Sequence, residues 1–262
     1  MGSNTVNIRK FDLSTIEFNR KCVVIGKTGT GKSILVKDIL YHQRNNIPVG
    51  QVISSTDSAS PFYSKFIPKI VIHPEYNSSK LKKLVKRQKK MVKEFGNVKK
   101  ASSFLILDDC LHEANAWQKD TIIKDIFFNG RHYALLFILT MQYPLGISPD
   151  LRTNIDYTFI LREPIFKNRK KLYENYAGMF KSFDDFCTAL DILTDDYGCM
   201  VINNRTNSNK LEDQVFYYKA KKRDNFRMCD PELWEFSKNN YVSEEDSSDG
   251  EIKSSKLIVK RI

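Results

Sequence analysis

The chain has 262 residues, of which 41% are hydrophobic and 28% charged, as expected for a globular protein that can bury a full core. Its longest apolar run, residues 134–139, is far shorter than a membrane span, the N-terminus lacks the apolar stretch of a secretory signal, and the five cysteines are widely spaced. These features argue against a membrane protein or a disulfide-stabilised secreted protein, while the net charge of +11 favours a polyanionic partner, most often nucleic acid.

The first half of the chain alternates short apolar runs with helical patterns. Residues 20–25 predict a buried strand, and a glycine-rich turn follows it. A helix is predicted from Lys32 onward, with its apolar residues on one face. The next predicted elements are strands at residues 51–55, 69–72 and 104–107, an amphipathic helix at residues 78–95 and a helix at residues 120–128.

The second half continues the alternation. Its predicted strands cover residues 134–140, 157–161, 199–203 and 215–218, and its predicted helices cover residues 167–179, 183–193 and 231–238. Strands that alternate with helices, several of them continuously apolar, predict an α/β fold with a mostly parallel sheet covered on both faces.

The chain is predicted to divide into four parts. They are an N-terminal extension (residues 1–17), a central α/β domain that carries the motifs described below (residues 18–220), a C-terminal helical segment (residues 221–242) and an acidic, disordered tail (residues 243–262). The tail begins with five acids and no base in residues 243–251, so the rest of the chain has a larger positive charge than the net charge of +11 for the whole chain. Residues 256–262 alternate apolar and basic residues and could add a strand to a partner.

Residues 26–33 read Gly-Lys-Thr-Gly-Thr-Gly-Lys-Ser and match the phosphate-binding P-loop pattern G-x-x-x-x-G-K-[ST]. The glycines let successive backbone N–H groups curve around phosphates, and the following helix directs its positive end toward them. Lys32 is expected to neutralise the β- and γ-phosphate oxygens, and Ser33 to ligate Mg²⁺. The pattern predicts Mg-ATP binding by Gly26, Lys27, Thr28, Gly29, Thr30, Gly31, Lys32 and Ser33.

Four apolar residues at positions 104–107 are followed by two acids, Asp108 and Asp109. The apolar run predicts a buried strand whose C-terminal tip places Asp108 beside the P-loop. We expect Asp108 to hold Mg²⁺, directly or through water, and Asp109 to orient or deprotonate the attacking water. An acidic turn after a strand is common, so this assignment depends on the P-loop.

The long stretch between Lys32 and Leu107 leaves room for at least one strand–helix unit. This spacing predicts a P-loop ATPase with an additional strand between the two motif strands, rather than a compact nucleotide kinase.

Three further polar residues are candidates to complete the site. Gln142 follows the strand predicted at residues 134–140, where its side chain could contact the γ-phosphate and detect its loss; an ordinary loop glutamine is the alternative. Arg131 and Arg152 are candidates for the arginine that stabilises charge on the transferring phosphoryl group, often from a neighbouring subunit. Either arginine could instead form a surface ion pair, and the sequence does not separate them.

The ordered set of motifs resembles the DNA-packaging ATPases of nucleocytoplasmic large DNA viruses, of the poxvirus type, and of virophages, within the FtsK–HerA superfamily. The resemblance spans about residues 18–163 and extends more weakly to about residue 220. Asp109 stands where many superfamily members have glutamate, and its shorter reach leaves its role as the base open. The matching segments are GKTGTGKS at 26–33, LILDD at 105–109, GRHY at 130–133, TMQ at 140–142 and LRTNIDY at 151–157.

This resemblance implies an ATP-hydrolysing motor that translocates double-stranded DNA and packages the viral genome into preformed capsids. It also implies a homo-oligomeric ring with active sites completed across subunits, and contacts with capsid proteins. The implied location is the host cytoplasm and the virion.

The amphipathic helix predicted at residues 78–95 is the candidate DNA contact. Eight lysines and arginines lie between Lys80 and Lys93, and several are four residues apart. Each such like-charge pair costs about 0.2–0.5 kcal/mol in an isolated helix, so a polyanion would relieve the repulsion. The alternative is an ordinary solvated face in a lysine-rich protein. Residues 219–223 are a second basic candidate, and a packaging motor needs only backbone contacts to DNA, without sequence readout.

Two other functions remain open. A nucleoside or nucleotide kinase shares the P-loop, but it would need an arginine-rich lid and an acid for the acceptor sugar, of which the sequence offers no convincing example. A non-hydrolysing ATP-binding virion assembly protein would not need Asp109, Gln142 or the candidate arginines.

Overall fold

The computed structural model describes residues 6–110, 117 and 119–241. This part of the chain contains one sheet, whose strands are β1 (Arg9–Lys10), β2 (Lys21–Ile25), β3 (Val49–Ser54), β4 (Ile72–His73), β5 (Ser103–Asp108), β6 (Leu135–Met141), β7 (Tyr157–Ile160), β8 (Gly198–Asn203) and β9 (Val215–Lys219).

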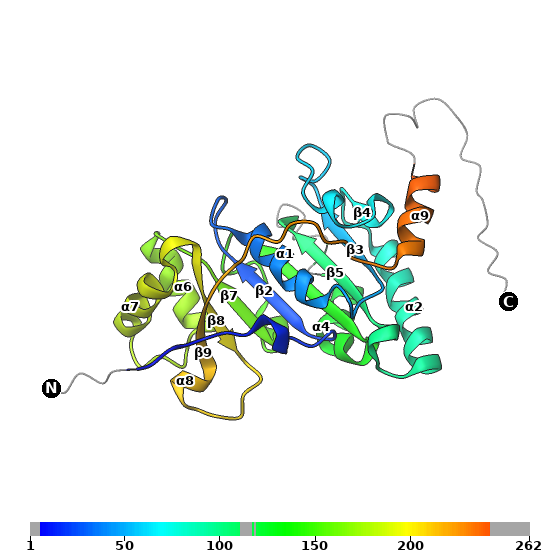
Figure 1. The fold of residues 1–262 in the computed structure, drawn as a ribbon. Coiled ribbons are helices and arrows are strands. Elements are labelled where there is room, and N and C mark those ends of the chain that lie inside the picture. Colours follow the sequence, from blue (N-terminus) through cyan, green and yellow to red (C-terminus); the bar gives the residue numbers. More distant parts are fainter. Residues whose placement is uncertain (1–5, 111–116, 118, 242–262) are drawn as a thin grey trace.

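The sheet has the strand order β1-β9-β8-β7-β2-β6-β5-β3-β4 (Figure 1). Only the pairs β7–β8 and β8–β9 are antiparallel among the described strands, so β8 runs against all the others. The predicted α/β fold with a mostly parallel sheet flanked by helices is confirmed.

Helices cover both faces of the sheet, as the continuously apolar strands require. One face packs against α1 (Lys32–Gln43), and the other packs against most of the remaining helices. Side chains of β2 alternate between the faces: Cys22 and Val24 pack with α1, and Val23 and Ile25 pack on the opposite side. The other helices are α2 (Ser78–Phe95), α4 (Thr121–Asn129), α5 (Pro149–Arg152), α6 (Phe166–Tyr176), α7 (Phe183–Leu193), α8 (Leu211–Gln214) and α9 (Pro231–Asn240).

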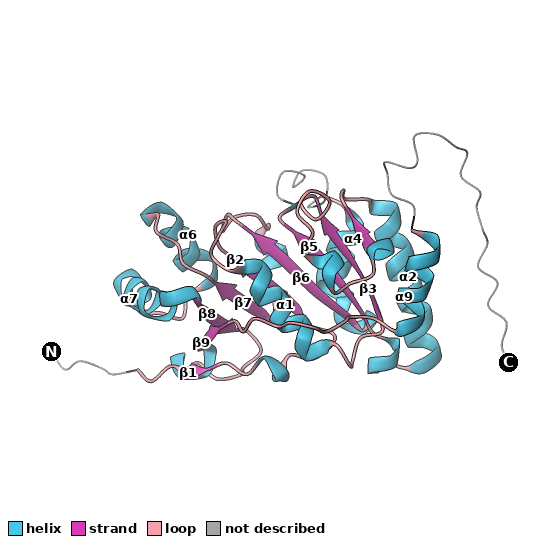
Figure 2. Ribbon diagram, turned by 45° about the horizontal axis from the view of Figure 1, so that its top comes forward, coloured by secondary structure: helices cyan, strands magenta, loops and turns pink. Residues whose placement is uncertain are grey.

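The two ends of the sheet carry different helices. In Figure 2, α6 and α7 lie at the end near β8, and α2 and α9 lie at the end near β3. The short helix α8 precedes β9 in the chain and packs against it and against β8.

A strand does separate the two motif strands, as predicted. It is β6, which pairs with β2 on one side and β5 on the other. The residues between the two motifs instead supply β3 and β4, which lie beyond β5. The predicted extra strand is therefore confirmed, and it comes from the chain after the second motif.

Some boundaries differ from the predictions. The strand predicted at residues 69–72 is wrong over most of its length, because Lys69–Val71 forms a 3₁₀ turn and β4 begins only at Ile72. The helix predicted at residues 167–179 ends at Tyr176. The predicted disordered tail and the partner-binding strand at residues 256–262 lie outside the described residues.

The first described residues belong to the same domain as the sheet. Residues of the predicted N-terminal extension form β1, which pairs in parallel with β9. Phe11, Leu13 and Ile16 are buried in the core on the α1 face.

After β9 the chain crosses the outer side of α1 as residues 220–230, which we call the crossing segment (Figure 1). Buried Asp38 of α1 anchors it. The Asp38 carboxylate accepts hydrogen bonds from the Tyr218 hydroxyl at 2.8 Å, the Lys221 backbone N–H at 2.8 Å and the Arg223 guanidinium at 2.7 Å. Further along, the Met228 N–H donates to the Phe66 carbonyl at 2.8 Å. Arg223, part of the second candidate DNA contact, is therefore an internal anchor.

Candidate nucleotide-binding site

Five parallel strands bring their C-terminal ends to one edge of the sheet, and the P-loop lies there. The Gly26 N–H donates to the Met141 carbonyl at 2.9 Å, and the Leu161 N–H donates to the Ile25 carbonyl at 2.8 Å. The ends of β2, β6 and β7 are thus held side by side. The ends of β3 and β5 continue the same edge, because both strands pair in the same direction.

The P-loop glycines occupy positions that other residues would strain. Gly29 and Gly31 have φ values of 80° and 102°, in the left-handed region, and Gly31 is the N-cap of α1. A Cβ on Gly26 would lie 2.7 Å from Thr30 Oγ1 and 2.9 Å from Leu161 Cβ. The sequence therefore builds a tight loop that leads directly into the N-terminus of α1, as phosphate binding requires.

The Lys32 side chain folds back across the P-loop. Its Nζ donates to the Gly26 carbonyl at 2.7 Å and to the Lys27 carbonyl at 3.1 Å. Burial lowers the pKa of Lys32, while the carboxylates of Asp109 and Asp108 act in the opposite direction. The ammonium thus lies between the loop and the two acids, where a terminal phosphate would need its charge.

Asp108 is buried at the end of β5 and is 7% exposed. Its Oδ1 accepts a hydrogen bond from the Thr140 hydroxyl at 2.7 Å, and its Oδ2 accepts a longer one from Ser54 at 3.5 Å. Burial raises the pKa of Asp108, and the bond from Thr140 opposes this shift. The carboxylate therefore has a fixed orientation and an oxygen with little hydrogen bonding.

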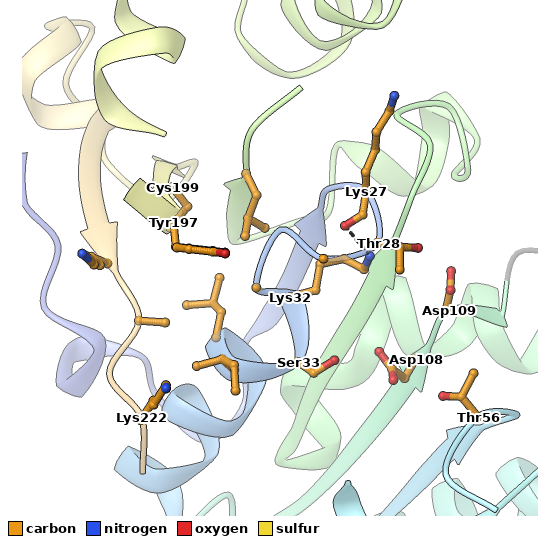
Figure 3. A pocket seen from close by; sticks show the side chains of 17 residues that line it. Lys27, Thr28, Lys32, Ser33, Thr56, Asp108, Asp109, Tyr197, Cys199 and Lys222 are labelled. Carbon is orange, nitrogen blue, oxygen red and sulfur yellow. Dashed lines mark hydrogen bonds between the residues drawn. The ribbon is translucent and has the colours of Figure 1, made fainter. Parts of the chain in front are cut away.

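This arrangement fits a magnesium ion held mainly by its nucleotide. Among the described residues, no group of three or more histidine, cysteine, aspartate or glutamate side chains could hold a metal alone. Mg²⁺ commonly takes one or two protein ligands together with substrate phosphates and water. Asp108 and the Ser33 hydroxyl line the same pocket and are the residues that would supply those ligands (Figure 3).

Asp109 and Gln142 form a hydrogen-bonded link to the P-loop. The backbone of Asp109 is left-handed, with φ at 54°, and its N–H donates to Thr140 Oγ1 at 2.9 Å. Its carboxylate accepts a hydrogen bond from the Gln142 amide, whose oxygen accepts one from the Thr28 hydroxyl at 3.4 Å. The structure thus brings together three predicted site residues from three separate segments.

The two candidate arginines lie elsewhere. Arg131 precedes β6, at the opposite edge of the sheet from the P-loop, and its guanidinium contacts the buried Asp156 carboxylate at 2.6 Å. Arg152 ends α5, donates to the Ile147 carbonyl at 2.9 Å and lies over the Tyr176 ring. Of the residues placed in the structure, those that line the pocket include neither arginine.

The pocket has a volume of about 690 Å³, within the usual range for a small-molecule site. It extends from the two acids across the P-loop to the start of β8 and the crossing segment (Figure 3). No sequence motif marks the pocket residues beyond the P-loop, because they come from segments that are distant in the chain. Those residues are Thr56, Leu161, Tyr197, Cys199, Lys219, Ala220 and Lys222.

A model of the family described as the poxvirus A32 protein matches residues 7–165. The chain belongs to this family. Relatives include the uncharacterized protein L437 of Acanthamoeba polyphaga mimivirus, which is 42% identical over 229 residues, covering 85% of this chain and 80% of that protein. The uncharacterized protein 075L of Invertebrate iridescent virus 6 is 37% identical over 247 residues, covering 91% of this chain and 92% of that protein.

Solved structures with the same fold as this A32-family chain include two proteins described with bound nucleotides. The genome packaging NTPase B204 from Sulfolobus turreted icosahedral virus 2, in complex with AMP, has a TM-score of 0.59 at 16% identity, covering 79% of this chain and 100% of that one. The pCW3 conjugation coupling protein TcpA, with ATPgS, has a TM-score of 0.53 at 14% identity, covering 80% and 62%. At these identities the likeness establishes the P-loop fold. In the described part of the chain, no helix is both long and apolar enough to cross a membrane.

Proposed function

We propose that this chain is an ATP-hydrolysing motor that translocates double-stranded DNA and packages viral genomic DNA into preformed capsids. The observation that carries the proposal is the hydrogen-bonded link from Thr28 through Gln142 to Asp109, beside the buried Asp108. Binding alone needs a P-loop, whereas a link between the loop and an acid that can orient water suits hydrolysis. Membership of the A32 family and a fold shared with the genome packaging NTPase B204 support the same function.

Each part of the site has a distinct proposed role. Residues 26–33 bind the phosphates of ATP, and Lys32 neutralises the β- and γ-oxygens. Asp108 and Ser33 hold Mg²⁺, which when bound helps to neutralise the phosphate charge. Asp109 orients or deprotonates the attacking water. Gln142 touches both Asp109 and Thr28, so a shift of the P-loop after γ-phosphate release would reach the acid through it.

The proposed DNA contact is the outer face of α2. Leu81, Leu84, Val85 and Gln88 are buried, and the Gln88 amide donates to the carbonyls of Ala101 at 2.8 Å and Tyr133 at 2.9 Å. The helix is thus fixed to the domain and its basic side chains face outward. Within the structure's described residues, one of the eight, Lys89, forms an ion pair, with Asp125 at 3.3 Å. Of the other seven, Lys80 contacts His73 and Arg87 contacts Gln88, and the remaining five are the proposed contacts to DNA phosphates, without sequence readout.

A ring of identical subunits would supply what one chain lacks at the site. Hydrolysis of ATP is usually aided by an arginine that stabilises the transferring phosphoryl group. Since the pocket lining described above contains none, we propose that Arg131 or Arg152 of a neighbouring subunit completes it. Capsid proteins are the further proposed partners, and the host cytoplasm and the virion are the proposed locations.

The central test measures phosphate release with and without double-stranded DNA. We expect hydrolysis that DNA stimulates, and a loss of about a hundredfold or more in Lys32→Ala and in Asp109→Asn. Transfer of phosphate to a nucleoside would favour the kinase alternative. Tight ATP binding with no turnover under any DNA condition would favour a non-hydrolysing assembly protein.

A charge-reversal variant tests the DNA surface. Lys86→Glu, Lys90→Glu and Lys93→Glu together should weaken DNA binding and lower the slope of log affinity against log salt by about 3, because about three phosphate contacts are lost. Lys89 is left intact because it pairs with Asp125. The matched control reverses three exposed lysines at the other end of the sheet, Lys167, Lys170 and Lys181. Equal loss of DNA affinity in both variants would remove α2 from the proposal.

A further inference from the structure

One end of the nucleotide pocket has a chemistry that phosphate and metal binding do not use. The acids and Thr56 line one end, and the P-loop crosses the middle (Figure 3). The opposite end is formed by Leu161, Tyr197, Cys199 and Ala220, with Lys219 and Lys222 beside them. A triphosphate on the P-loop with its metal near Asp108 would direct its nucleoside toward this apolar and aromatic end.

Tyr197 is the prominent side chain at that end. It is 67% exposed, and Figure 3 shows its ring projecting into the pocket toward the P-loop. A Cβ added to Gly31 would lie 3.9 Å from Tyr197 Cδ1 and 3.7 Å from Leu161 Cδ2. The ring therefore borders the P-loop itself at Gly31.

The backbone holds Tyr197 in an unfavourable conformation. Asp196 and Tyr197 have φ values of 46° and 59°, in the left-handed region that suits glycine or asparagine. Gly198 follows, where a Cβ would lie 2.4 Å from the Leu193 carbonyl oxygen, so the turn cannot easily relax. An exposed aromatic residue kept in a strained turn beside a ligand pocket points to a role in binding.

Neighbouring contacts fix this end of the pocket. The Lys219 ammonium pairs with the Asp196 carboxylate and so ties the turn to β9. The crossing segment that carries Ala220 and Lys222 is anchored to α1 through Asp38, as described above. Since α1 begins at the P-loop, the wall around Tyr197 is built on the same helix that receives the phosphates.

We infer that this end of the pocket is the base-binding subsite of the nucleotide site, with the Tyr197 ring stacking on the purine base of a nucleoside triphosphate. The inference rests on the proposed ATP-binding function. Stacking on an aromatic ring suits any base and favours purines through their larger area, and a loss of stacking weakens binding by about tenfold. Lys219 and Lys222 supply positive charge at the same end.

The test compares ATP with inorganic tripolyphosphate, which has no base, as ligands of the full chain with Mg²⁺. Tyr197→Gly removes the ring and relieves the left-handed strain, so its Tm should equal or exceed that of the wild type. We expect its Kd for ATP to rise about tenfold, its Kd for tripolyphosphate to stay within about twofold, and Tyr197→Phe to bind ATP like the wild type. Ile192→Ala, an exposed apolar residue on α7 outside the pocket, is the control.

Two failures are distinguishable. The proposed ATP function itself is wrong if the wild type binds neither ligand. It is also wrong if the Lys32→Ala variant binds both ligands as tightly as the wild type does. If the wild type binds ATP in a Lys32-dependent way but Tyr197→Gly binds it equally tightly, the base subsite is not at Tyr197. Equal weakening of ATP and tripolyphosphate by Tyr197→Gly would also overturn the inference, because it would place the effect on the phosphates.

Discussion

The two edges of the sheet each contain a buried aspartate, and the surroundings of these residues differ. Asp108 lies at the C-terminal edge beside the P-loop, and Asp156 lies at the N-terminal edge before β7. They are 7% and 1% exposed. The length of β2, with five residues at roughly 3.3 Å each, separates the two edges.

Asp156 is fully surrounded by donors from its own chain. It accepts hydrogen bonds from the Lys21 backbone N–H at 2.9 Å and from Arg131 at 2.6 Å, and Arg205 lies 3.9 Å away. Asp108, by contrast, has the hydroxyl groups of Thr140, Ser54 and Tyr63 beside it and forms no ion pair among the described residues. Burial raises the pKa of Asp108, although the hydrogen bonds from Thr140 and Tyr63 and the charge of Lys32 act in the opposite direction.

We propose that this difference separates a structural acid from a functional one. A buried carboxylate with its own cations contributes to the stability of the fold. A buried carboxylate without them is costly until a ligand supplies the positive charge, and such residues concentrate at functional sites. Both acids belong to segments that resemble the packaging ATPases, so sequence similarity alone does not separate their roles.

The largest expected effect comes from exchanging each aspartate for asparagine. Asp108→Asn should reduce ATP hydrolysis by about a hundredfold or more, since the proposed ligand for Mg²⁺ is lost. Asp156→Asn should leave Mg-ATP affinity unchanged but reduce the free energy of unfolding by about 2–3 kcal/mol, because the nearby cations lose their counter-charge. Nucleotide titration and urea unfolding of both variants measure these effects.

Unlike Asp156→Asn, the Asp108→Asn substitution should not lower the free energy of unfolding at neutral pH. The folded-state pKa of Asp108 is raised, so its stabilising contribution is present at acidic pH and is lost as pH rises through the folded pKa. Above that pH, without metal or nucleotide, the asparagine variant should be at least as stable as the wild type. Equal destabilisation by both substitutions would contradict the distinction between the two edges.

Much of the phosphate end of the site could be predicted from sequence, because its chemistry is local. The P-loop is contiguous, and the apolar runs that end at Asp108 and before Gln142 mark strands whose ends meet in a parallel sheet. The same reasoning predicted most strands and helices. It failed at β1 and β4, since each has two residues and depends on its neighbour for its conformation.

The rest of the site depends on tertiary packing that no local pattern reveals. Asp38 reads as a polar residue on an amphipathic helix, yet it is fully buried because the crossing segment covers the outer side of α1. Tyr197 enters the pocket through a left-handed turn that its residue type disfavours. Arg131 was predicted as a catalytic candidate, and only the structure shows that it pairs with Asp156 of the same chain.

The same comparison can be made between two buried lysines, one at each edge of the sheet, where substitution is expected to have a smaller effect. Lys21 begins β2 and Lys32 follows it across the P-loop, and they are 2% and 9% exposed. Burial lowers the pKa of Lys21 to about 8, although Asp156 acts in the opposite direction. Burial also lowers the pKa of Lys32. The proposed function requires the charge of Lys32, but it does not require the charge of Lys21.

We therefore expect Lys21→Met to stabilise the protein at neutral pH and to leave Mg-ATP affinity unchanged. Below about pH 8 both folded and unfolded states carry the Lys21 proton, so the folded state bears the full cost of the buried charge. Between pH 8 and the ordinary lysine pKa of about 10.4 only the unfolded chain binds the proton, and the cost disappears as pH rises. The gain in unfolding free energy should thus be roughly 2–3 kcal/mol at pH 7 and near zero at about pH 10.5.

Urea unfolding of the variant and the wild type at both pH values measures this gain. A gain that does not depend on pH would show that apolar packing, rather than the buried charge, causes the effect.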